Sequence, residues 1–305
     1  MELNTFLRLT DIGIVKHLFI YFIILAAIIF GLVVFFVIFY SIKYRASKVS
    51  GTPEQNHGNR KFEIFITATA VCVTAFFLVL TLHAMQEIQT IPENPVPDIE
   101  ITGHQWWEAK YPDGNVITAN EIHIPVGKKM MLQLTSGDVI HSWWVPALGR
   151  KMDMIPGITN HMWFTASEPG EYLGSCSEFC GMQHARMRIR VIAQSQTDFD
   201  NWKAEQLKSA IAPSTEKAIM GKQLFEQKTC ASCHNIAGAN GRIGPDLTHF
   251  ASRKWFLSDF KRNTIENLHD WLKDPQQIKK GVKMPDFILS DKELDALVAY
   301  IHSLK

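Results

Sequence analysis

Two long uncharged apolar segments near the start of the chain constrain its fold more than any other feature. Leu18 to Tyr40 and Ile64 to Gln86 each contain 23 residues without Lys, Arg, Asp or Glu. About 20 apolar residues allow a helix to cross the hydrocarbon core of a bilayer. We therefore expect two transmembrane helices, at residues 17–42 and 63–86, within an N-terminal part spanning 1–90. A buried core helix is the alternative for each segment, and the first is too long for the core of a cleaved signal peptide.

The charges beside these segments predict an orientation in the membrane. The connecting loop holds five basic residues and one acidic residue, namely Lys43, Arg45, Lys48, Arg60 and Lys61 against Glu54. The stretch just after the second segment is acidic, with Glu87, Glu93, Asp98 and Glu100. Because Lys and Arg favour the cytoplasmic side, both termini should lie outside the cytoplasm. We expect a multi-pass protein of a bacterial plasma membrane, with its later parts in the oxidising periplasm.

The part that follows has the pattern of short strands. Apolar and polar residues alternate over 121–126, 130–135, 162–166 and 187–193, and Pro112-Asp113-Gly114 and Pro169-Gly170 mark turns. Such spacing is typical of an all-β sandwich or barrel, which we place at 91–195. A helical linker at 196–213 and a helical domain at 214–305 should complete the chain. Ser290 and Glu293 have the spacing of a capping box at the start of the last helix.

The charge of the chain is balanced overall but uneven along it. A net charge of +1 excludes a dedicated nucleic-acid-binding protein, which would be strongly basic. Residues 88–195 hold 8 basic and 11 acidic residues, whereas residues 214–305 hold 14 basic and 11 acidic residues. Opposite charges favour docking of the helical domain on the β-domain, especially at low salt. The alternative is that each set of charges is a solvated surface.

A cluster of soft metal ligands lies in the predicted β-domain. The segment reads Cys176-Ser-Glu178-Phe-Cys180-Gly-Met-Gln-His184-Ala-Arg-Met187, and His141 precedes it by 35 residues. Thiolate, thioether and imidazole ligands suit copper or zinc. Two thiolates in one loop can bridge two copper ions, which leaves one histidine for each ion and two weak axial ligands. The alternatives are a disulfide, which needs neither His nor Met, and a four-ligand zinc site, which would leave Met187 unused.

A second metal-binding motif lies in the helical domain. Cys230-Ala-Ser-Cys233-His234 has the C-x-x-C-H spacing of covalent c-type haem attachment, with His234 as the proximal iron ligand. A redox-active cysteine pair is the alternative. Met284 is our candidate for the second axial ligand, because a loop methionine held by the following Pro285 can face the iron. His/Met ligation would raise the haem potential relative to His/His. The other possible ligands are Met220, His249, His269 and His302.

These motifs resemble two known families. The segments 135–146, 151–157 and 174–187 closely resemble subunit II of haem–copper cytochrome c oxidase, and residues 214–305 resemble class I cytochrome c. The resemblance implies a multidomain membrane protein with a two-helix transmembrane hairpin, an all-β cupredoxin-like domain and an all-α cytochrome c domain. It also implies a binuclear CuA centre, whose ligands would be His141, Cys176, the backbone carbonyl of Glu178, Cys180, His184 and Met187.

The resemblance also implies roles for three residues that their chemistry alone does not single out. The Glu178 carboxylate would reach a magnesium ion shared with subunit I. Trp106, beside Trp107, matches the residue at which electrons enter. Many relatives have a third aromatic where this chain has Glu108, and an ordinary core role is the alternative for either Trp. Glu63 matches an acid at the mouth of a proton path into subunit I, or is simply an interfacial acid.

The expected function is electron transfer within a respiratory cytochrome c oxidase. The donor would be a cytochrome c or a quinol:cytochrome c reductase, and electrons would pass through haem c and CuA to haem in subunit I, where O2 is reduced to water. The partners would be subunit I, other oxidase subunits and membrane lipid. The alternatives are the matching subunit of a CuA-type nitric-oxide reductase, the copper-free subunit of a quinol oxidase, and a free-standing membrane-anchored electron carrier or copper-delivery protein. The intact copper ligands argue against the quinol-oxidase type.

Overall fold

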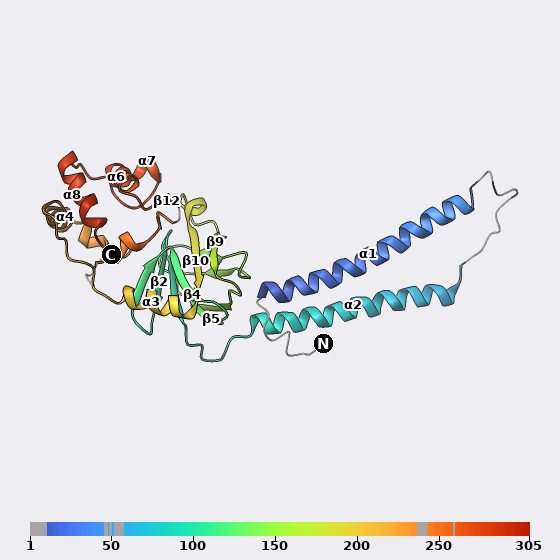
Figure 1. The fold of residues 1–305 in the computed structure, drawn as a ribbon. Helices are drawn as coiled ribbons and strands as arrows, with labels where there is room; N and C mark the ends of the chain where they lie inside the picture. The colour runs from blue at the N-terminus through green and yellow to red at the C-terminus, as the bar shows by residue number, and fades with distance from the viewer. Residues whose placement is uncertain (1–10, 46–47, 49–50, 52–57, 237–242, 259) are drawn as a thin grey trace. The chain divides into compact units, whose positions relative to one another are not determined.

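The chain forms two compact units, Met1–Thr90 and Ile91–Lys305, in a computed structural model (Figure 1). The structure describes residues 11–45, 48, 51, 58–236, 243–258 and 260–305. The first ten residues of the predicted N-terminal part, and Glu54 of the predicted cytoplasmic loop, lie outside the described residues.

Two apolar helices make up the described part of the first unit. They are α1 (Asp11–Lys43) and α2 (Arg60–Gln89), and both are long and apolar enough to cross a membrane. The side-chain hydroxyls of Thr67, Thr69 and Thr74 donate to backbone carbonyls one turn earlier, at 2.8–2.9 Å. These bonds satisfy the polar groups of an otherwise apolar helix.

Residues 99–194 of the second unit form a sandwich of two five-stranded sheets, which confirms the predicted all-β region. In chain order the strands are β1 (Ile99–Gly103), β2 (Trp107–Tyr111), β3 (Val116–Ala119), β4 (Glu121–Pro125), β5 (Met130–Ser136), β6 (His141–Trp144), β7 (Met152–Met154), β8 (Asn160–Phe164), β9 (Gly170–Cys176) and β10 (Arg188–Gln194). One sheet has the order β3-β2-β1-β5-β8 and the other β4-β10-β9-β6-β7. Buried and partly exposed residues alternate along β1 and β2, because one face of a sandwich sheet packs inward.

The rest of the second unit is mainly helical. Its helices are α3 (Gln196–Gln206), α4 (Glu216–Gln227), α5 (Cys230–Cys233), α6 (Ile265–Lys273), α7 (Pro275–Ile278) and α8 (Asp291–Ile301), with a short 3-10 helix η3 (Phe250–Ser252). The capping box predicted at the start of α8 is confirmed, since Ser290 and Glu293 bond each other's backbone N–H groups. One detail departs from a purely helical pattern: β11 (Trp255–Phe256) pairs with β12 (Lys261–Arg262). Positive φ angles of 56° at Leu257 and Ser258 turn the chain between these strands.

Helices α4 and α8 pack closely at Gly221. A Cβ atom added there would lie 2.0 Å from the backbone oxygen of Ala296 and 2.7 Å from the Cβ of Tyr300. Since a backbone oxygen cannot rotate away, the helices can approach this closely only around a glycine.

We therefore predict that Gly221→Ala destabilises the helical region by about 1–3 kcal/mol, the usual effect of overpacking a core. Denaturant unfolding of the full chain, followed through the signal of its helices, measures this change. The matched control is Lys222→Ala, at an exposed position of the same helix, which should leave the midpoint unchanged. Equal midpoints for Gly221→Ala and the original chain would contradict the close contact.

Candidate metal centres

The six residues predicted to bind copper are brought together by strand pairing and a returning loop. Strand β6 pairs with β9 so that Trp143 lies opposite Cys176. Because His141 begins β6 and Cys176 ends β9, this pairing places the histidine beside the first cysteine. The chain then turns back, and the N–H of Cys176 donates to the carbonyl of Met187 at 2.9 Å.

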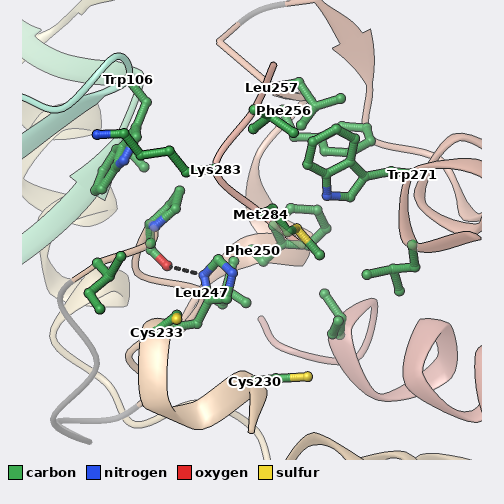
Figure 2. A pocket seen from close by; sticks show the side chains of 18 of the residues that line it. Trp106, Cys230, Cys233, Leu247, Phe250, Phe256, Leu257, Trp271, Lys283 and Met284 are labelled. Atoms are coloured by element: carbon green, nitrogen blue, oxygen red, sulfur yellow. Dashed lines mark hydrogen bonds between the residues drawn. The ribbon is translucent and has the colours of Figure 1, made fainter. Parts of the chain in front are cut away.

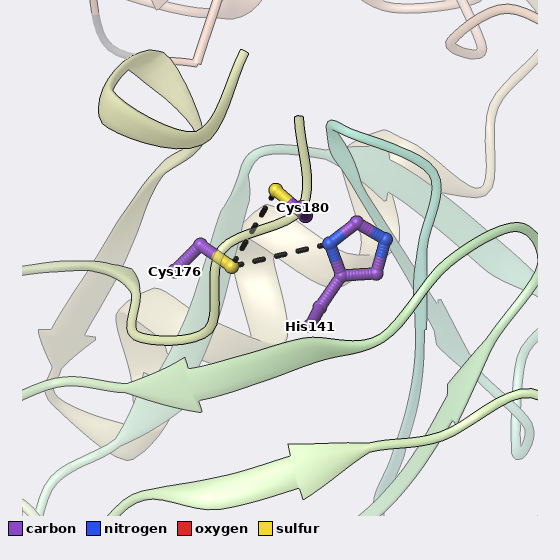
Figure 3. A group of neighbouring side chains, drawn as sticks. All are labelled: His141, Cys176 and Cys180. Atoms are coloured by element: carbon purple, nitrogen blue, oxygen red, sulfur yellow. Dashed lines mark hydrogen bonds between the residues drawn. The ribbon is translucent and has the colours of Figure 1, made fainter. Parts of the chain in front are cut away.

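The distances between the ligand atoms suit a pair of ions that share two sulfur atoms. The Sγ atoms of Cys176 and Cys180 are 3.8 Å apart (Figure 3). Two sulfur atoms at this spacing, each about 2.3 Å from one ion, make a roughly tetrahedral angle at that ion. Each thiol has its own histidine, since Cys176 Sγ lies 3.9 Å from His141 Nδ1 and Cys180 Sγ lies 3.9 Å from His184 Nδ1.

Two weaker ligands complete the set. The Sδ of Met187 lies 3.8 Å from Cys180 Sγ, and the backbone oxygen of Glu178 lies 3.2 Å from Cys176 Sγ. The site therefore offers one imidazole and one weak axial group beside each thiol. This arrangement leaves no predicted ligand unused, in contrast to a zinc site of four ligands.

Both copper-site cysteines are free thiols, and they differ in acidity. Their sulfur separation is almost twice the roughly 2.05 Å of a disulfide bond. Burial opposes ionisation of Cys176, but hydrogen bonds with His141, Ser142 and Glu178 outweigh it and lower the pKa of the thiol to about 7. Burial and the neighbouring Cys176 raise the pKa of Cys180 to about 12. Metal binding, which needs both thiolates, must therefore displace a proton.

Asp138 orients the first histidine. Its Oδ1 accepts a hydrogen bond from His141 Nε2 at 2.7 Å, which leaves Nδ1 on the side of the thiols. Burial alone would raise the pKa of Asp138, but hydrogen bonds from His141, Val139 and Lys283 outweigh it and lower that pKa, so the carboxylate is charged. Sequence reasoning gave Asp138 no role. A carboxylate three residues before a ligand histidine is a signal that could have identified it.

Two further residues shape the copper site, and sequence reasoning missed both. Gln105, with φ of 62°, donates from its side-chain amide to the carbonyl of Cys180 at 2.7 Å and so supports the cysteine loop. Gly103 makes room for the histidine, since a Cβ there would lie 2.5 Å from Cδ2 of His141.

The adjacent tryptophans occupy different environments. Trp107 is 1% exposed, and its ring meets that of His141 edge to face at 5.9 Å. Trp106 instead stacks on His104 at 5.2 Å. Trp106 also lines a cavity of the second unit (Figure 2). The two candidates for electron entrance are thus a core residue and a cavity residue.

That cavity, of about 280 Å³, also collects the predicted haem-binding residues. Cys230 and Cys233 on α5 line it together with Met284 (Figure 2). His234, just after α5, also lines it. Its wall is largely apolar and includes Phe225, Leu247, Phe250, Trp271, Leu297 and Ile301. The other possible iron ligands, Met220, His249, His269 and His302, are not among the described residues that line it.

The setting of His234 fits an iron ligand. Its Nδ1 lies 2.8 Å from the carbonyl oxygen of Pro245, an interaction that fixes the ring and leaves Nε2 to bind. Burial lowers the pKa of His234, so the ring is neutral at physiological pH, as metal binding requires. Gly244 leaves space for the ring, since a Cβ there would lie 2.6 Å from Cε1 of His234.

The remaining predicted residues are acids outside both clusters of ligand atoms. The side chain of Glu178 is exposed, although its backbone oxygen faces Cys176. Glu63 lies in the first turn of α2, in the first unit, and is exposed.

Ion pairs join the β-sandwich to the helical region, with the charge signs that the uneven charge distribution along the chain predicts. Lys283 Nζ lies 3.0 Å from Asp138 Oδ2, and Lys254 Nζ lies 3.6 Å from Glu171 Oε1. In both pairs the base comes from the helical region and the acid from the sandwich. These pairs bring the two sets of metal-binding residues into one compact unit.

Comparison with known proteins agrees with this layout. The family model described as the periplasmic domain of cytochrome c oxidase subunit II matches residues 113–194, and the cytochrome c model matches residues 218–305. These families define a copper- and haem-binding class of protein.

Similar full-length proteins share both parts. Cytochrome c oxidase subunit 2 of Alkalihalophilus pseudofirmus is 38% identical over 294 residues, covering 92% of this chain and 86% of that protein. The protein of the same name from Bacillus subtilis is 30% identical, covering 90% and 83%. The solved periplasmic domain of subunit II of cytochrome oxidase from Bradyrhizobium japonicum is 34% identical with a TM-score of 0.36, covering 38% of this chain and 96% of that chain. The chain belongs to the cytochrome c oxidase subunit 2 family, as its motifs predicted.

The contact between Gly103 and His141 leads to a prediction for the copper site. Gly103→Ala should displace the imidazole and at least halve the copper bound per chain, because the added methyl overlaps the ring. Metal analysis and the EPR spectrum of the copper-loaded chain measure the effect. Glu100→Ala, a partly exposed position on the same strand, is the control and should bind copper normally. Normal copper content in Gly103→Ala would contradict this packing.

Proposed function

We propose that this chain is the electron-transfer subunit of a respiratory haem–copper cytochrome c oxidase, passing electrons from an external donor through covalent haem c and a binuclear CuA centre to haem in subunit I. Reduction of O2 to water belongs to subunit I. The observation that carries the proposal is that both sets of predicted metal-binding residues lie together in one compact unit of the chain.

The binuclear form of the copper centre is supported by the number and pairing of its ligands. When bound, the copper pair accepts and releases one electron at a time. Cys176 and Cys180 would bridge the two ions, while His141 and His184 would each bind one ion. Both thiols are buried, and Asp138 fixes the ring of His141. These ligands would therefore move little when an electron is gained or lost, which would keep the reorganisation energy small.

Covalent haem attachment is supported by the position of the two cysteines at the cavity. Cys230 and Cys233 lie three residues apart on α5 and so fall on one side of the helix. His234 ends this helix, with its N–H bonded to the carbonyl of Cys230 at 3.0 Å. Thioether bonds from both cysteines and an iron bond from His234 would then hold one porphyrin, with Met284 as the second axial ligand.

The location and partners follow from the rest of the chain. Helices α1 and α2 would anchor the protein in a bacterial plasma membrane, with the second unit on the periplasmic side. Subunit I, other oxidase subunits and lipid would surround the anchor, and a cytochrome c or a quinol:cytochrome c reductase would supply electrons. The exposed Glu178 carboxylate is available for a magnesium ion shared with subunit I, and Glu63 for a proton path.

Trp106 is our proposed residue for electron entrance to the copper site. It lines the same cavity as the haem cysteines, whereas Trp107 is enclosed in the sandwich core. The nitric-oxide reductase alternative is not favoured, because relatives covering most of the chain are named as cytochrome c oxidase subunits.

The cofactor content gives the most direct test of this function. The purified full chain should show a mixed-valence dicopper EPR signal and a c-type optical band, with about two copper ions and one haem. Cys176→Ser should abolish the dicopper signal and leave the haem band, because the two sites use different cysteines. One copper ion per chain, or none, would contradict the binuclear assignment.

Met284 gives a separate test of the haem site. Met284→Leu should keep the covalent haem but lose the charge-transfer band of sulfur bound to ferric iron, and it should lower the haem potential. Met220→Leu is the matched control, since Met220 packs against the helical core rather than lining the cavity. If Met284→Leu retained the sulfur–iron band, another residue would have to be the axial ligand.

A further inference from the structure

Hydrogen bonds join the segment that carries Met284 to the copper-ligand loop. We call residues 278–284 the methionine loop. Gln183 donates from Nε2 to the carbonyl of Lys280 at 2.6 Å, and Arg186 donates from its guanidinium to the carbonyl of Ile278 at 2.7 Å. The two donors flank the predicted copper ligand His184 in the sequence. Because both acceptors are backbone oxygens, these bonds do not depend on the side chains of the methionine loop.

The other copper-ligand histidine is connected to the same loop through one carboxylate. Asp138 accepts from Nε2 of His141 at 2.7 Å with Oδ1, and Nζ of Lys283 lies 3.0 Å from its Oδ2. Lys283 immediately precedes Met284. A single ion pair thus links the neighbour of a predicted haem ligand to the partner of a predicted copper ligand.

The methionine loop is braced from both sides. The Gln276 side chain donates to the carbonyls of Val282 and Met284 at 2.9 and 3.2 Å and accepts from the N–H of Gly281 at 3.0 Å. Gly281 has φ of +81°, and a Cβ there would lie 2.8 Å from the Sδ of Met182. A loop held this closely can transmit the position of Lys283 to Met284.

We infer that Lys283 is a positioning residue for haem-to-copper electron transfer, which holds the methionine loop against Asp138 and balances the negative charge that Asp138 presents to His141. The inference rests on the proposed function, because it needs both metal sites. The step would carry one electron from ferrous haem iron to the oxidised copper pair, and it would need no proton or further reactant.

If Lys283 balances the charge of Asp138, its removal should change the copper reduction potential, which a loss of packing alone would not do. Without the cation, the negative charge of Asp138 acts undiminished on His141 and stabilises the oxidised, more positive copper pair. The copper reduction potential should therefore fall. The Lys283 side chain is 63% exposed and that of Asp138 is 17% exposed, so salt should weaken the contact without abolishing it.

The test compares three substitutions in the full chain loaded with both cofactors. Lys283→Gln should lower the copper potential and slow electron transfer after flash reduction of the haem by about two- to fivefold at low salt, the range for a pair with one exposed partner. High salt should narrow this difference. Lys283→Arg should restore both values, because it keeps the cation.

Lys280→Gln is the matched control. It removes the same charge from an exposed side chain of the same loop, which makes no ion pair among the described residues, and it keeps the carbonyl that bonds Gln183. It should therefore behave as the original chain. A water-soluble carbodiimide, which joins amines to carboxylates in direct contact, should also link Lys283 to Asp138, as mass spectrometry can detect.

The outcomes separate this inference from the proposed function. If the dicopper signal and the c-type band are present while Lys283→Gln changes neither potential nor rate, the inference is wrong and the function stands. Equal decreases of the copper potential and of the electron-transfer rate in Lys280→Gln would also overturn the inference, since general surface charge would then explain the effect. If the original chain lacks the dicopper signal, the proposed function itself fails.

Discussion

The pairing of β6 with β9 is the constraint on which the copper site depends. It sets Trp143 opposite Cys176 and so places His141, at the start of β6, beside a cysteine 35 residues away in the sequence. The other ligands follow within eleven residues of Cys176, and the loop closes when the N–H of Cys176 bonds the carbonyl of Met187. The sandwich core holds both strands, so the fold itself brings the predicted copper ligands together.

In the proposed function, the chain uses two kinds of cysteine pair for two kinds of metal chemistry. Cys176 and Cys180 lie in a loop with their sulfur atoms 3.8 Å apart, a spacing at which both sulfur atoms could bridge two ions. Cys230 and Cys233 lie on one short helix at the edge of an apolar cavity, where a flat porphyrin can be held by both. Histidines lie beside both pairs, and two of them are oriented through the second ring nitrogen: His141 by Asp138 and His234 by the Pro245 carbonyl.

Local patterns in the sequence were sufficient to predict a large part of this structure. The long apolar runs predicted two helices, the alternating segments predicted an all-β sandwich or barrel, and the Ser290 capping box was found where expected. The ligand motifs were short enough to be recognised without coordinates. Contacts between distant segments could not be predicted, because nothing in the local pattern pairs Asp138 with Lys283 or Gln105 with Cys180. The difference between Trp106 and Trp107 likewise depends on which one faces the sandwich core.

The proposed function requires one chain to transfer an electron internally between a haem and a copper pair. Flash reduction of the haem in the isolated full chain, with the copper signal recorded at the same time, measures this transfer directly. Haem oxidation and copper reduction should proceed at the same rate, and this rate should not change as the protein is diluted. A rate that falls in proportion to protein concentration, or haem oxidation without copper reduction, would contradict it.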